Sequence, residues 1–167
     1  MEKKTFEEVI EILKTVYESV SDFAFNGGCD IPEDFQYSES TQKLYDEYLR
    51  LENEFTTHPE YRKYRLTKSD EFSRIESAYW DFQSKNNVPE CFQIEYLNHL
   101  GIGNFTEVNQ YGGEGQGDTW YSIKYFPLLD MYIRIDGWYQ SYNGTEFNGW
   151  EDCSEVKPTE KTIIVYE

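Results

Sequence analysis

Hydrophobic residues recur at helical spacing through the first part of the chain. Thr5 and Glu8 have the spacing of a capping box, which predicts the start of a helix. The apolar stripe that follows consists of Phe6, Ile10, Leu13, Tyr17 and Val20. Because Asn26-Gly27-Gly28 is a strong breaker, we expect one helix that ends before it.

Two further helices are predicted between residues 40 and 88. After Ser40 a stripe with helical spacing consists of Leu44, Tyr48, Leu51 and Phe55, and Pro59 closes it. After Ser69 a second stripe consists of Phe72, Ile75, Tyr79 and Phe82. This helix ends at Asn86-Asn87-Val88-Pro89, because the residue before a proline is steered away from helix.

The pattern changes to alternation after Pro89. One alternating segment has Tyr121, Ile123 and Tyr125 between Ser122 and Lys124. A second has Met131, Ile133 and Ile135 between Tyr132, Arg134 and Asp136. Such alternation is typical of a strand with one buried face. Further predicted strands are 137–142, ended by the turn dipeptide Asn143-Gly144, and 162–166, with weaker candidates at 94–97 and 105–110. The glycine-rich residues 112–117 predict a hairpin loop, because Asp118-Thr119-Trp120 follow them instead of the Lys-Ser/Thr pair of a phosphate loop.

These elements predict an α+β fold with about three N-terminal helices packed on a C-terminal antiparallel sheet of about four to six strands. Charge does not divide the chain, since residues 1–88 carry a net charge of −8 and residues 89–167 carry −9. We therefore expect a single domain over 1–167, in which a helical part (1–88) and a β-rich part (89–167) share one core.

The net charge of −17 disfavours direct binding to nucleic acid or to an anionic membrane. Its mean density is also lower than that of DNA, so imitation of DNA would require the acids to gather on one face. The folded surface carries about one net charge per 500 Å², whereas duplex DNA carries one per about 100 Å². The chain has no apolar run that could span a bilayer, no signal-peptide core and only three cysteines. These features predict a cytoplasmic protein with reduced thiols.

No catalytic or metal-binding residue is predicted, and no cofactor. His58 and His99 have no partner at a ligand spacing, and the acids next to Cys153 raise the pKa of a thiol rather than activating it. Paired carboxylates are abundant because acids are abundant, so a solvated surface explains them. A carboxylate hydrolase remains a third hypothesis, and it requires two acids in one pocket with separated pKa values.

Aromatic residues are concentrated between residues 111 and 152, which we interpret as the candidate partner-binding region. Its candidate contact residues are Tyr111, Glu114, Asp118, Trp120, Trp138, Tyr139, Tyr142, Asn143, Glu146, Trp150 and Asp152. Tyr and Trp supply large contact area at low entropic cost, but a compact β-rich core uses bulky rings equally well. Both interpretations stay open.

One basic stretch interrupts the acidity. Its candidate phosphate or anion contacts are Arg62, Lys63, Tyr64, Arg65 and Lys68. Bases interleaved with rings suit a nucleotide, through charge-assisted hydrogen bonds and stacking. The same bases could instead pair with the surplus acids of the protein itself.

The C-terminal third, about 60 residues, resembles a segment of small proteins of tailed bacteriophages. The likeness rests on Gly112-Gly113-Glu114-Gly115, Gly137-x-Tyr139-x-Ser141-Tyr142-Asn143-Gly144, Trp150 and the ending from Glu155 to Glu167. That group has no settled activity, so the resemblance implies an origin and no functional residues. We expect a non-enzymatic intracellular binding protein, a phage factor that inhibits a host protein involved in defence or nucleic-acid handling. The alternative is a small-ligand binder that sequesters a nucleotide-type signal.

Overall fold

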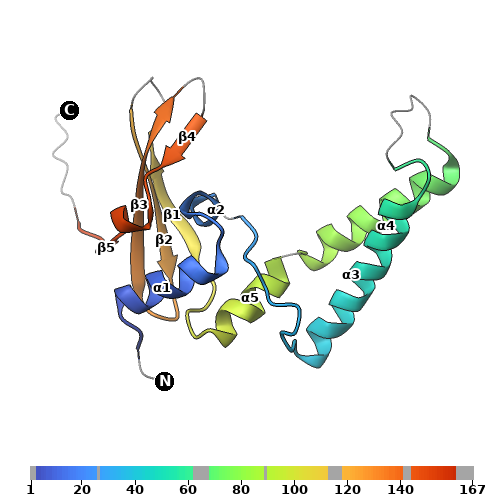
Figure 1. Cartoon of the computed structure of the whole chain (residues 1–167), viewed down its shortest axis with the longest axis horizontal. Helices are drawn as coiled ribbons and strands as arrows, with labels where there is room; N and C mark the ends of the chain where they lie inside the picture. Colours follow the sequence, from blue (N-terminus) through green and yellow to red (C-terminus); the bar gives the residue numbers. More distant parts are fainter. Residues whose placement is uncertain are drawn as a thin grey trace, which may run out of the picture. The chain divides into compact units, whose positions relative to one another are not determined.

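The computed structural model describes residues 3–25, 27–61, 68–88, 90–112, 118–140 and 144–160. These residues contain five α-helices and a five-stranded antiparallel sheet, which confirms the α+β class with more helices than expected (Figure 1). The chain divides into two compact units: Met1–Asp30 with Asn98–Glu167, and Ile31–Leu97. The prediction of one domain with a shared core stays a prediction.

The first unit begins with two helices where the sequence predicted one. Thr5 and Glu8 form the expected capping box at the start of α1 (Phe6–Val16). The backbone is extended at Tyr17, and α2 (Val20–Ala24) begins after Ser19. The Ser19 hydroxyl accepts a hydrogen bond from the Asp22 N–H and donates one to the Asp22 carboxylate. The single-helix prediction is therefore wrong, because a serine N-cap starts a new helix inside the apolar stripe.

The sheet comprises β1 (Thr106–Tyr111), β2 (Thr119–Phe126), β3 (Met131–Gln140), β4 (Gly144–Phe147) and β5 (Ser154–Val156). The order is β1-β2-β3-β4, and β5 also pairs with β3. All pairs are antiparallel, and a bulge lies between Glu107 and Asn109 of β1. The separate strand predicted at 137–142 is wrong, because its first residues continue β3. The strand predicted at 162–166 lies outside the described residues.

The core of the first unit lies between the two helices and one face of the sheet (Figure 1). This inner face contributes Phe126, Met131, Ile133 and Ile135, all of them buried. Phe23 of α2 is fully buried and its ring contacts four others: Tyr17, Phe105, Phe126 and Trp150, with centroids 5.1–6.2 Å away. Rings thus fill the space that smaller aliphatic residues fill in other cores.

The second unit contains α3 (Glu39–Thr57), α4 (Asp70–Asn86) and the start of α5 (Glu90–His99). The two predicted stripes meet, since Leu51 and Phe55 are buried together with Phe72 and Tyr79. Phe55 stacks on Phe72 and on Tyr79, with ring centroids 5.7 and 5.0 Å apart.

The strand predicted at 94–97 is wrong, because these residues belong to α5. Asn87 ends α4 in the left-handed conformation, and its carbonyl accepts a hydrogen bond from the Cys91 N–H, while its side chain donates to Glu90. A new helix therefore starts within one turn of the old one. A short apolar run cannot be told from a strand by periodicity alone.

Ser38 and Glu95 join the start of α3 to α5 within the second unit. The Ser38 side chain caps α3, and both the N–H and the hydroxyl of Ser38 donate to the Glu95 carboxylate. Burial acts to raise the pKa of Glu95, but the hydrogen bonds from Ser38 and Thr41 outweigh it and lower the pKa below its ordinary value.

We expect Ser38→Ala to raise the pKa of Glu95 and to lower the free energy of unfolding by about 1 kcal/mol, because the substitution removes a cap and a donor. Since the folded pKa is the lower one, the stabilisation is complete above the unfolded pKa and is lost as the pH falls through the folded pKa. A carboxyl NMR titration and urea unfolding at pH 7 and pH 3 measure both effects. The control Ser73→Ala removes an exposed hydroxyl from α4. Equal Glu95 pKa values in the two variants would contradict the prediction.

Candidate functional site

In β2 the polar side chains face inward and the aromatic side chains face outward, which is the reverse of what their hydropathy predicts. Ser122 and Lys124 are buried on the inner face of the sheet, with exposed fractions of 1% and 0%. Tyr121, Ile123 and Tyr125 lie on the outer face and are half-buried. The most polar positions of the strand are therefore inside, and its rings are outside.

An ion pair accounts for this arrangement. The register places Lys124 opposite Glu107 of β1, and the Lys124 ammonium lies 3.0 Å from the Glu107 carboxylate. The Ser122 hydroxyl donates to the same carboxylate oxygen at 2.8 Å. Burial lowers the pKa of Lys124, and Glu107 opposes that shift. The inner face thus accepts a charge because it also holds its counter-charge.

The outer face gathers five aromatic side chains, which we call the aromatic sheet face: Tyr111, Tyr121, Tyr125, Tyr132 and Trp138. Tyr111 is 61% exposed, and the other four are half-buried. The Tyr125 and Tyr132 rings stack at 4.3 Å, and the Tyr111 and Tyr121 rings at 5.8 Å. The pairs follow from the register, in which Tyr125 faces Tyr132 and Tyr111 faces Tyr121. Cross-strand aromatic pairs of this kind stabilise a sheet while leaving ring surface in contact with water.

Three carboxylates and one guanidinium accompany these rings. Arg134 lies over the Tyr121 ring, 4.2 Å from its centroid, and donates through Nε and Nη2 to Asp136 at 2.7–3.1 Å. This pairing raises the pKa of Arg134. The Tyr125 hydroxyl donates to Asp130 at 3.3 Å, and Glu146 pairs with Trp138 in the register of β3 and β4.

The predicted contact residues are divided between the two faces. Tyr111, Trp138 and Glu146 lie on the outer face, whereas Trp120 and Tyr139 lie on the inner side by alternation from Lys124 and Ile135. Trp150 is half-buried and stacks on the buried Phe23 at 5.7 Å, so it packs against the core. Asp118 and Asp152 are exposed at element ends. Glu114, Tyr142 and Asn143 lie outside the described residues.

Sequence reasoning missed three of the five rings as contact residues: Tyr121, Tyr125 and Tyr132. The signal was present for Tyr132, which alternates with buried Met131 and Ile133. For Tyr121 and Tyr125 the alternation predicted the buried face instead, because their neighbours Ser122 and Lys124 are polar.

The basic stretch is described only at its end. Arg62, Lys63, Tyr64 and Arg65 lie outside the described residues. The Lys68 ammonium donates to both carboxylate oxygens of Glu76 at 2.6 and 2.7 Å and lies 5.6 Å from the centroid of the Phe72 ring. Lys68 therefore pairs with one of the protein's own acids, as the second interpretation of this stretch predicts.

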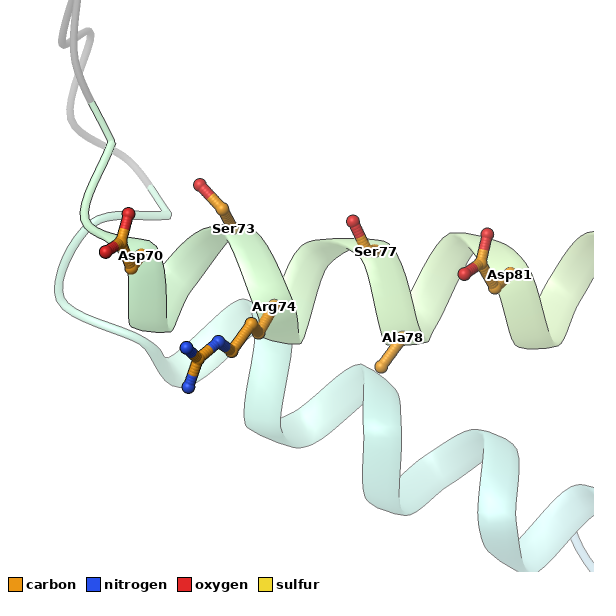
Figure 2. Close-up of a pocket in the computed structure, with 6 residues that line it drawn as sticks. All are labelled: Asp70, Ser73, Arg74, Ser77, Ala78 and Asp81. Carbon is orange, nitrogen blue, oxygen red and sulfur yellow. The ribbon is translucent and has the colours of Figure 1, made fainter.

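A hollow open to solvent lies on the surface of α4. Its lining residues all come from that helix and are exposed: Asp70, Ser73, Arg74, Ser77, Ala78 and Asp81. Figure 2 shows Ser73, Ser77 and Asp81 pointing away from the neighbouring helix and Arg74 extending toward it. Without an opposing wall, the hollow cannot exclude water from a substrate. The described ranges also contain no cluster of three or more metal-ligating side chains.

The cysteines have the properties of structural residues. Burial raises the pKa of Cys153 to about 12 and that of Cys29 to about 11, and it also raises the pKa of Cys91. A thiol with a raised pKa stays protonated at neutral pH and is a poor nucleophile.

No protein-family model, curated protein or solved structure matches the chain significantly. Within the described ranges, none of the helices is both long and apolar enough to cross a bilayer.

Proposed function

We propose that this protein is a non-enzymatic binding protein that engages a partner protein through the aromatic sheet face. One observation carries the proposal: five Tyr and Trp side chains from three adjacent strands lie on one side of the sheet, half-buried or exposed. Tyr and Trp are enriched at interfaces because they bury large area while losing few rotamers. An apolar patch rimmed by polar groups is typical of an interaction site.

Charge supports a partner with a basic surface. The described residues from 98 to 160 include nine acidic and three basic side chains. Two of those bases, Lys124 and Arg134, are already paired with Glu107 and Asp136. A surface of this kind attracts a basic partner over long range and repels nucleic acid. Together with the resemblance to phage proteins, this favours a host protein that binds nucleic acid, and inhibition by occupying its basic surface.

We expect the double substitution Tyr125→Ser/Tyr132→Ser to weaken partner binding by about 30-fold, because paired rings at the centre of an interface contribute about 2 kcal/mol or more. The full chain is used to capture partners from bacterial lysate at low salt, where charge attraction is strongest. Each partner is then purified, and its dissociation constant is measured for wild type and variant.

The matched control is Trp80→Ser, which removes a ring that is 53% exposed from α4 in the other unit. We expect this variant to bind as the wild type does. Equal binding by the Tyr125/Tyr132 variant and the wild type would overturn the proposed function. Failure to capture any partner at low salt would also count against it.

A further inference from the structure

The aromatic sheet face contains one guanidinium site that is already filled. Arg134 lies over the Tyr121 ring, and its Nε and Nη2 donate hydrogen bonds to the Asp136 carboxylate. The ring stacks on the flat face of a guanidinium, and the carboxylate accepts hydrogen bonds from its N–H edge. The chain thus shows what chemistry this face accepts.

The same face repeats this combination of ring and carboxylate without a cation. Tyr125 and Tyr132 form the tightest ring pair of the sheet, at 4.3 Å, and Asp130 lies beside them. Asp130 Oδ1 accepts a hydrogen bond from the Tyr125 hydroxyl. Among the described residues, no Lys or Arg pairs with Asp130 or stacks on either ring, and Oδ2 accepts no hydrogen bond.

We propose that this second site, formed by Tyr125, Tyr132 and Asp130, binds an arginine side chain of the partner. The inference rests on the proposed function and names the chemistry of its partner: a protein segment that presents arginine. Charge complementarity selects a cation, and the rings favour guanidinium over ammonium. A lysine ammonium is compact and strongly hydrated, so it gains less from a flat ring pair than an arginine does.

The test compares hexa-arginine and hexa-lysine binding to the full chain by calorimetry in 150 mM salt. Both peptides carry the same charge, so long-range attraction affects them alike. We expect hexa-arginine to bind about fivefold more tightly, as cation–π stacking at a partly exposed ring implies. NMR signals of the Tyr125 and Tyr132 rings should shift during the titration.

Two substitutions test the site itself. Tyr125→Leu removes a ring, and Asp130→Asn removes the charge at a position with φ of 52°, which Asn tolerates. Each should reduce the affinity for hexa-arginine to that for hexa-lysine. The control Asp34→Asn makes the same change in net charge at an exposed position before α3, in the other unit, and should keep the fivefold ratio.

Equal affinity of the wild type for the two peptides overturns the inference, as does a fivefold ratio that survives both Tyr125→Leu and Asp130→Asn. Either result is distinct from failure of the proposed function, which is measured by partner capture. If the Tyr125→Ser/Tyr132→Ser variant loses the partner while the wild type shows no preference for arginine, this inference fails alone.

Discussion

Replacing Glu107 with alanine lowers the free energy of unfolding by about 3–5 kcal/mol, because it removes the carboxylate that forms an ion pair with a buried ammonium. The Lys124 side chain has no exposed surface, and the Glu107 carboxylate accepts its hydrogen bond at 3.0 Å. Ser122 loses the acceptor of its hydroxyl in the same variant. Urea unfolding at pH 7, followed by circular dichroism, measures the loss.

The loss of unfolding free energy caused by Glu107→Ala, relative to the wild type, should become smaller as the pH rises. Without Glu107, Lys124 can avoid a buried charge by losing its proton. For a lysine with an ordinary pKa of about 10.4, this costs at most about 4–5 kcal/mol at pH 7. The unfolded chain then binds one more proton than the folded chain, so stability increases with pH. We expect the deficit to fall by about 1.4 kcal/mol per pH unit between pH 7 and pH 9.5.

Three further variants separate the ion pair from a general effect on the sheet. Lys124→Met should cost less than Glu107→Ala, because the Glu107 side chain is 28% exposed and can turn toward water. The double variant Glu107→Ala/Lys124→Met should return to within about 1 kcal/mol of the wild type. Glu155→Ala removes an exposed acid from β5 and should cost less than about 0.5 kcal/mol. A double variant as unstable as Glu107→Ala would contradict the assigned role of the pair.

Phe23→Ala is the second substitution with a large expected effect, a loss of about 3–5 kcal/mol. Phe23 has no exposed surface and contacts rings of Tyr17 directly after α1, of Phe126 in β2 and of Trp150 in the 3-10 helix Trp150–Asp152. Truncation leaves a cavity that neighbours from three elements cannot close together. Urea unfolding followed by near-ultraviolet circular dichroism measures the stability and the packing of Trp150.

Phe25→Ala is the matched control, because it removes the same side chain two residues further along. Phe25 is 57% exposed and contacts Phe147 edge to face at 5.2 Å. We expect it to cost less than about 1.5 kcal/mol. Equal losses in the two variants would show that Phe23 is not the centre of this core.

Periodicity predicted the long elements well. One predicted stripe ends with Leu51 and Phe55, and the next begins with Phe72. The two stripes pack against each other in the second unit. The alternation around Ile133 placed the buried face of β3 correctly. Where the apolar set was long and its spacing regular, local pattern and tertiary packing agreed.

The failures share a physical cause, which is that a polar side chain decided the structure. Ser19 starts α2 inside an apolar stripe, and Asn87 starts α5 where an apolar run resembled a strand. Lys124 is buried because Glu107 lies opposite, and hydropathy does not reveal such cross-strand pairing. The candidate site was therefore predicted in the right region, but its paired tyrosines were not identified.

The first unit consists of two separate segments of the chain, Met1–Asp30 and Asn98–Glu167, and this affects the order of folding during synthesis. Phe23 meets its partners Phe126 and Trp150 only after residues 31–97 and most of the sheet have been made. At a ribosomal rate of about 5–20 residues per second, the apolar stripe of α1 and α2 waits about 6–25 seconds for its sheet. The helices α3 and α4 are neighbours in the chain and can pair during that interval. The nascent N-terminal helices are thus the part of this protein that most needs chaperone protection.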